Sequence, residues 1–162
     1  VNQSFQLKEH ITMPLMADSD SHFRLFLGDI GMFSYQSGIN ASQFISSERE
    51  TTLSGIFFEN FAANELTAKG HKLFYWRGKT SSEIEFIIES GGKLYPIDVK
   101  KGRGVLNSLE KFASHNRFEC AVKVSKNNYG YDEGRKLLTV PFYYFPFVAA
   151  ELANGNFTVK SN

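Results

Sequence analysis

The chain has 162 residues and a formal net charge of +1, and hydrophobic residues make up 42% of it. These values predict one globular domain with a substantial core, and they exclude a strong overall field that would attract nucleic acid. No apolar run approaches the roughly 20 residues of a membrane-spanning helix, and the single cysteine, Cys120, cannot form an internal disulfide. We therefore expect a cytoplasmic protein with no membrane segment. Because the sequence starts at Val1 rather than Met, we also expect it to be part of a longer chain.

The first 50 residues predict an N-terminal extension that leads into the main domain. Residues 1–22 are polar and mixed, which is typical of loop. The segment FRLFLGDIGMF, from residue 23, is apolar and interrupted by Gly28 and Gly31, so we expect a short strand followed by a short helix. Residues 38–50 are polar again.

Residues 51–69 predict a helix that ends at Gly70. Its apolar positions cover most of the circumference, so the helix should pack on more than one side. The exception is Glu59, whose arc of the helix contains mostly small residues: Gly55, Ile56, Ala62, Ala63 and Leu66. Burying an acid in such an arc is costly without a partner, which makes Glu59 a candidate functional residue.

Three strands are predicted next, at residues 72–77, 83–89 and 93–100. The second alternates, so we expect one face to carry Ile84, Phe86 and Ile88 and the other to carry Glu83, Glu85, Ile87 and Glu89. The rest of the chain predicts a helix at 105–115, strands at 118–124 and 137–140 separated by a polar loop, and a short helix after Pro146. The aromatic run FYYFPF, from residue 142, should close the core, and docking of a partner is the alternative.

The turn Ser90-Gly91-Gly92-Lys93 predicts a β-hairpin that brings charged side chains together. With a two-residue or four-residue loop, Glu85 faces Asp98 and Glu83 faces Lys100, and Asp98 and Lys100 share a face of their strand. A three-residue loop would instead place Glu85 and Asp98 on opposite faces.

Two facing carboxylates repel each other unless a cation neutralises them. Mg²⁺ is commonly held by one or two carboxylates with water and substrate phosphate, and a nearby lysine can position water or stabilise phosphate charge. Glu59 could supply a third carboxylate from the helix. A solvated strand face with an ordinary cross-strand ion pair remains the alternative. Four later cations, which fit scattered surface charges better than a binding surface, are Lys111, Arg117, Lys123 and Lys126.

Four segments together resemble the domain of unknown function that lies C-terminal to the ATPase module in many prokaryotic AAA-type ATPases. The segments are GIFFENFAANEL from residue 55, LFYWR from 73, SEIEFIIE from 82 and YPIDVKKG from 95. The similarity extends over roughly residues 10–145 and includes FRLFLGDIGM from residue 23.

That domain is similar to the PD-(D/E)XK nuclease superfamily, so the resemblance implies an α/β fold with a restriction-endonuclease-like αβββαβ core, a central mixed sheet flanked by helices. It also implies a site: Glu59 matches the helix acid, Glu85 the first strand acid, and Asp98 and Lys100 the acid-x-Lys pair. The family usually has Asp and then Glu at the two strand positions. Here the order is Glu85 and then Asp98. The longer side chain is therefore on the first strand and the shorter one on the second, which would shift the position of a bound metal.

We accordingly expect one domain over residues 1–162, with a nuclease-like core at 51–125 and a C-terminal strand and helix at 126–162. The sequence G-x-x-x-x-G-K-[ST] does not occur, so the ATPase module and its nucleotide site are not part of this sequence. Gly102-Arg103-Gly104 predicts a connection between strand and helix, in which Lys101 and Arg103 are candidate phosphate contacts.

Three functions remain open. The first is Mg²⁺- or Mn²⁺-dependent hydrolysis of DNA or RNA, with metal held by Glu59, Glu85 and Asp98 and water positioned by Lys100. The second is an inactive nuclease fold that binds nucleic acid or docks onto its own ATPase module. The third is a structural domain whose surface carries an ion-pair cluster.

Overall fold

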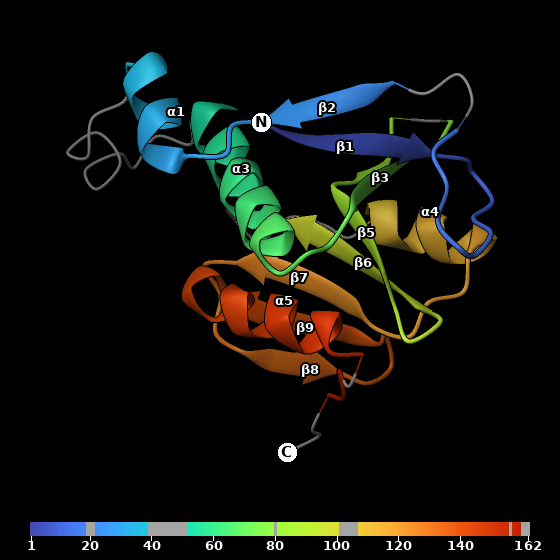
Figure 1. Ribbon diagram of the computed structural model, residues 1–162. Helices are drawn as coiled ribbons and strands as arrows, with labels where there is room; N and C mark the ends of the chain where they lie inside the picture. Colours follow the sequence, from blue (N-terminus) through green and yellow to red (C-terminus); the bar gives the residue numbers. More distant parts are fainter. Residues whose placement is uncertain (19–21, 39–51, 80, 101–106, 156, 160–162) are drawn as a thin grey trace.

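The computed structural model describes the chain except for residues 19–21, 39–51, 80, 101–106, 156 and 160–162. The described residues form nine strands in two mixed sheets, together with four α-helices and one 3-10 helix (Figure 1). The four-stranded sheet has the order β2-β1-β3-β4, with β1 at Asn2–Leu7, β2 at Phe23–Phe26, β3 at Leu73–Arg77 and β4 at Glu83–Ile84. The five-stranded sheet has the order β5-β6-β7-β9-β8, with β5 at Phe86–Ser90, β6 at Lys93–Val99, β7 at Ala121–Ser125, β8 at Gly130–Asp132 and β9 at Leu137–Pro141.

The helices are α1 at Ile30–Gln36, α3 at Thr52–Ala68, α4 at Asn107–His115 and α5 at Phe145–Ala153, with the 3-10 helix η1 at Phe142–Tyr144. The predicted succession of helix, three strands, helix and strand agrees with the observed order from α3 onward, which is α3, β3, β4 with β5, β6, α4 and β7. The α/β class is therefore confirmed, whereas the expected single central sheet is wrong because the strands divide into two sheets.

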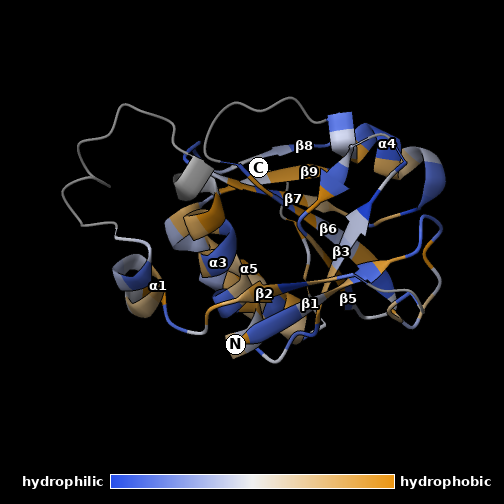
Figure 2. Cartoon of the chain, turned by 90° about the horizontal axis from the view of Figure 1, so that it is seen from above, coloured by the Kyte–Doolittle hydropathy of each residue, from blue (hydrophilic) through white to orange (hydrophobic). Residues whose placement is uncertain are grey.

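Two strands were not predicted, because each lies in a polar segment. β1 (NQSFQL) is mostly hydrophilic in Figure 2, yet it pairs antiparallel with β2 and parallel with β3. β8 (GYD) pairs with β9 inside the expected loop. The strand conformation of β1 depends on pairing with distant segments, and that of β8 on a hairpin with β9; local hydrophobic periodicity reports neither.

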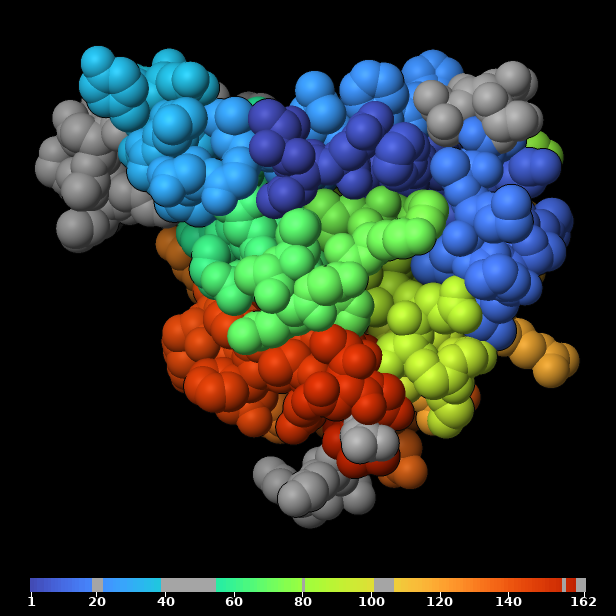
Figure 3. All heavy atoms as spheres, in the orientation of Figure 1, coloured from blue at the N-terminus to red at the C-terminus, as the bar shows by residue number. Residues whose placement is uncertain are grey.

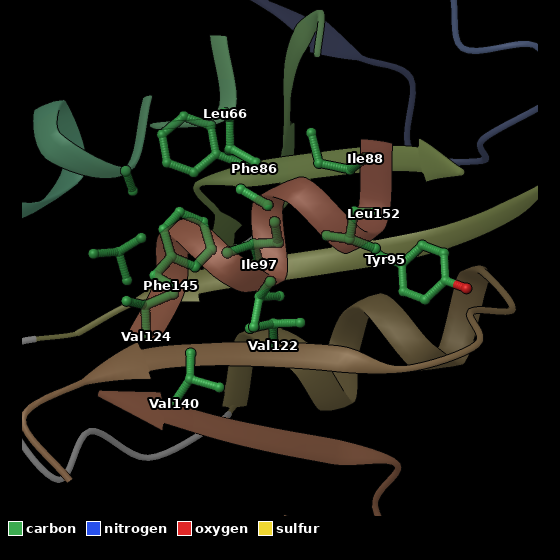
Figure 4. Close-up of a cluster of buried hydrophobic side chains, with 14 of the residues drawn as sticks. Leu66, Phe86, Ile88, Tyr95, Ile97, Val122, Val124, Val140, Phe145 and Leu152 are labelled. Carbon is green, nitrogen blue, oxygen red and sulfur yellow. The ribbon is translucent and has the colours of Figure 1, made fainter. Parts of the chain in front are cut away.

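The main core lies between the five-stranded sheet and the helices α3 and α5. Figure 4 shows Leu66 of α3 and Phe145 and Leu152 of α5 over side chains of the sheet, including Ile97 and Val122. Figure 3 shows the same contact from outside, with the red C-terminal helix directly against the green α3. A second core, beneath α4, includes Leu109, Phe112, Trp76 and Leu94. α3 also contacts α1 and strands of both sheets, as expected for a helix with apolar residues around most of its circumference.

The β5–β6 hairpin has the predicted register. Ser90 pairs with Lys93 and Phe86 with Ile97, so the loop is the two residues Gly91-Gly92. Both glycines have positive φ, 57° and 72°, a conformation that glycine adopts without the steric cost of a side chain.

The predicted alternation fails at Glu85, where the chain bends between β4 and β5. Phe86 and Ile88 lie in the main core, but Ile84 joins Ile87 in the second core. The bend shifts the alternation by one residue, so the expectation that Ile84 shares a face with Phe86 is wrong.

Candidate functional site

The C-terminal end of β6 places an acid and a base at the boundary of the core. Ile97 and Val99 point into the main core, so Asp98 and Lys100 lie on the other face of the strand. Lys100 Nζ is 3.0 Å from Asp98 Oδ1 and donates a hydrogen bond to Glu85 Oε1 at 2.9 Å. The structure therefore brings Glu85, Asp98 and Lys100 together, as the hairpin register predicts.

The bend at Glu85 directs its carboxylate toward β6. Glu85 Oε2 accepts a hydrogen bond from the backbone N–H of Val99 at 3.2 Å, and only 5% of the residue is exposed. Glu85 is thus attached to the end of β6 through a backbone contact as well as through Lys100. The side chain of Glu85 thus contacts β6 just beyond the last regular β5–β6 pair, Phe86 and Ile97.

Asp98 is also buried, with 8% of the residue exposed. Its Oδ1 forms no hydrogen bond with any described residue, although the ammonium of Lys100 is within ion-pair distance. The ammonium therefore neutralises charge without a hydrogen-bond geometry to that atom. Lys100 already compensates the charge of this oxygen, which, as a carboxylate oxygen with two lone pairs, can still accept a cation ligand.

The electrostatics of the three groups are strongly linked. Burial, and next the negative charge of Asp98, raise the pKa of Glu85 to about 8, while Lys100 acts in the opposite direction. Burial by itself would lower the pKa of Lys100, but the charges of Glu85 and Asp98 outweigh it and raise that pKa. At neutral pH the ammonium therefore stays charged, and Glu85 is ready to gain or release a proton.

Glu59 lies on α3 at the edge of the same region and is half-buried. Burial raises the pKa of its carboxyl, which also responds to the charges of Arg24, Glu83, Lys100 and Asp98. Glu59 is therefore within electrostatic reach of the β6 residues and is not simply solvated.

Glu83 does not face Lys100, so this expectation is wrong. It pairs with Arg77 of β3, and its carboxylate forms an ion pair with Arg24 of β2. The reason is the bend at Glu85, which assigns β4 to the four-stranded sheet and leaves β5 to pair with β6.

Lys123, expected to be one of several scattered surface charges, is instead buried, with 7% of the residue exposed. It lies directly beside Asp98 in the parallel pairing of β6 and β7, which places both side chains on one face of the sheet. The alternation of Val122, Lys123 and Val124 in the sequence was the available signal, since the two valines enter the main core.

Two predicted phosphate contacts, Lys101 and Arg103, lie outside the described residues. Among the residues that the structure describes, no group of three or more His, Cys, Asp or Glu side chains is arranged to hold a metal ion. The buried carboxylates that lie together are Glu85 and Asp98, and two carboxylates are a usual protein contribution to a Mg²⁺ site.

The family model described as Domain of unknown function (DUF4143) matches residues 54–143. The chain belongs to this family. The match begins within α3 and ends within η1, so this DUF4143 segment contains Glu59, Glu85, Asp98 and Lys100 but not β1, β2 or α1. The match is shorter than the resemblance, which extends over roughly residues 10–145. No match was found among curated proteins or among solved structures.

The described part of this DUF4143 domain contains no helix that is both long and apolar enough to span a membrane.

The aromatic residues of the run FYYFPF, from residue 142, differ in burial. Phe145 is buried in the main core and Phe142 stacks on Phe58 of α3 with ring centroids 4.1 Å apart, whereas Tyr143 and Phe147 are 79% and 63% exposed.

Proposed function

We propose that this domain is a nuclease-like module that uses Mg²⁺ or Mn²⁺ to hydrolyse a phosphodiester bond in DNA or RNA. The observation that supports the proposal is the buried pair of Glu85 and Asp98, which shares one ammonium and leaves Asp98 Oδ1 without a hydrogen bond. Two carboxylates supply hard oxygen donors, which suit a divalent cation such as Mg²⁺ or Mn²⁺.

Each residue has a distinct part in this proposal. Glu85 and Asp98 would hold the metal, which supplies positive charge beside the phosphate and a more acidic bound water. Lys100 lies against both carboxylates, so its ammonium can hold an anionic phosphate oxygen or a water next to them. Glu59 is near enough to influence this charge distribution from α3 and could accept a proton or bind a metal-bound water.

The proposal is tested by titrating the protein with Mn²⁺ in a calorimeter and by assaying nicking of DNA and RNA in the same buffer. We expect binding by the wild type and by Lys100→Ala, binding reduced at least tenfold in Asp98→Asn, and nicking by the wild type but by neither of these two variants. Glu110→Gln, an exposed change on α4, is the control and should behave as wild type. The absence of heat on adding millimolar Mn²⁺ to the wild type would refute the metal site.

A second candidate function is a non-catalytic module that docks onto an ATPase module of its own chain. The observation that favours it is the group of exposed aromatic residues near η1, in which the ring of Tyr144 lies 5.5 Å from both Tyr129 and Phe147. If this function is correct, Phe147→Ser should abolish co-purification with the ATPase module while leaving folding intact. Robust cleavage together with unchanged co-purification would count against it.

A further inference from the structure

Arg24 of β2 is a cation that the site as proposed above does not use. Its guanidinium forms an ion pair with Glu83 through Nη2 and lies over the ring of Tyr75, 4.4 Å from the centroid. The described contacts of Arg24 employ one of the five N–H donors of the group. The ion pair and the ring contact hold the guanidinium in one orientation, and 28% of the side chain is exposed.

Asn60 attaches the strand of Arg24 to the helix of Glu59. Its side-chain amide accepts a hydrogen bond from the backbone N–H of Leu27 at 2.8 Å and donates one to the carbonyl of Leu27 at 2.9 Å. Asn60 is 3% exposed and directly follows Glu59 in α3, and Leu27 directly follows β2. The backbone N–H and C=O of Leu27 are therefore both bound to the buried side chain of Asn60, which fixes β2 relative to α3.

Two contacts place Arg24 beside the candidate site. Its ion-pair partner Glu83 lies two residues before Glu85, and the ring of Phe26 in β2 lies 5.5 Å from the ring of Phe86, the residue after Glu85. Of the ionic groups that act on the pKa of Glu59, Arg24 has the largest effect, and Lys100 also acts on it. Glu59 thus lies under the influence of one cation from β2 and another from the end of β6. A nucleic-acid backbone carries repeated phosphates, so two cations on one surface can each neutralise one.

We propose that Arg24 is a second phosphate-binding residue, which contacts a backbone phosphate next to the one held at Lys100, and that Asn60 is its positioning residue. This inference rests on the proposed function, because it takes nucleic acid as the ligand. Arginine suits the role since its planar donors match phosphate oxygens in pairs. Glu83 and Tyr75 reduce the side-chain freedom that binding would otherwise remove.

The experiment measures the affinity of a fluorescent oligonucleotide by anisotropy over a range of KCl concentrations, with Ca²⁺ replacing Mn²⁺ to prevent cleavage. The slope of log affinity against log salt counts neutralised phosphates, at about 0.7 per contact for single strands and 0.9 for duplex DNA. We expect Arg24→Gln to reduce the slope by about one contact, and Arg24→Lys to restore it. The double variant Arg24→Gln/Glu83→Gln should show the same loss, although it has the wild-type net charge and leaves no unpaired acid.

Arg135→Gln is the matched control. Arg135 is exposed and precedes β9, so it lies at the opposite end of the parallel strands from Lys100, and its variant should keep the wild-type slope. Asn60→Ala should weaken oligonucleotide binding in the same direction as Arg24→Gln without changing the charge.

Two results would overturn the inference. The first is a wild-type slope in both Arg24→Gln and the double variant, which would make Arg24 a structural counter-ion of Glu83. The second is no oligonucleotide binding by the wild type at low salt. Neither result bears on the metal site, which the Mn²⁺ titration of the wild type tests separately.

Discussion

At the scale of single residues, the surroundings of Glu85 have opposing effects on its protonation. Burial and Asp98 favour its neutral form, while Lys100 and the N–H of Val99 favour its carboxylate. Because the pKa is raised from an ordinary value of 4.5 to about 8, protonation of Glu85 stabilises the fold fully below about pH 4.5. That contribution is lost as the pH rises through 8.

Glu85→Gln, which imitates the protonated form, should therefore have a pH-dependent effect on stability. Near pH 5 the variant should match the wild type, and at pH 9 it should be more stable by a few kcal/mol, because each unit by which a pKa is raised corresponds to about 1.4 kcal/mol. Urea unfolding at the two pH values measures the difference. Glu110→Gln is the control, and a difference between Glu85→Gln and wild type that is the same at both pH values would contradict the account.

Single residues also differ in how far their positions can be predicted from the sequence. Asp98 and Lys100 were placed correctly because a strand with aliphatic residues at alternate positions fixes which side chains share a face. Lys123 contradicts the expectation because its charge indicates a surface position, whereas the valines on either side indicate a buried strand. Arg24 had no local signal, since its position depends on the hydrogen bonds between Asn60 and Leu27, which are far apart in sequence.

At the scale of elements, the β5–β6 hairpin determines the geometry of the candidate site. Its register could be predicted because two consecutive glycines favour a two-residue turn with left-handed backbone. The bend at Glu85 could not be predicted, since it arises from β4 pairing with β3 while β5 pairs with β6. The site therefore depends on a hairpin that is encoded locally and on a division between sheets that is not.

A substitution in the turn tests this account of the hairpin. Gly92 has φ of 72°, and a Cβ there would meet no atom within 4 Å, so Gly92→Ala changes backbone energy without a clash. We expect a loss of about 1–2 kcal/mol in the free energy of unfolding. Gly92→Asn should lose less, because asparagine tolerates the left-handed region better. Equal stability of Gly92→Ala and wild type in urea unfolding would show that the turn is not constrained as described.

At the scale of the whole molecule, the two faces of the five-stranded sheet differ, because the candidate site lies on the face opposite the main core. One face carries the main core beneath α3 and α5, and the other is apolar beneath α4 but polar toward the ends of β6 and β7, where Asp98 and Lys123 lie. A sheet buried on both sides positions these polar groups rigidly, because the strands that carry them cannot shift without disturbing both cores.

Metal binding should consequently stabilise the entire domain. A ligand that binds only the folded state raises the unfolding temperature, and a metal requires Glu85 as the carboxylate. We expect the increase in melting temperature with 1 mM Mn²⁺ to be larger at pH 8 than at pH 6. Asp98→Asn should show almost no increase at either pH. A shift in the wild type that is larger at pH 6 would contradict the assignment of Glu85 as a ligand.

The central claim is that Glu85 and Asp98 together form a divalent-metal site, and anomalous diffraction from Mn²⁺-soaked crystals tests it most directly. The account predicts an anomalous peak within coordination distance of both carboxylates, and its loss in crystals of Asp98→Asn. Soaked wild-type crystals in which Lys100 still joins the two carboxylates and no peak lies beside them would contradict it.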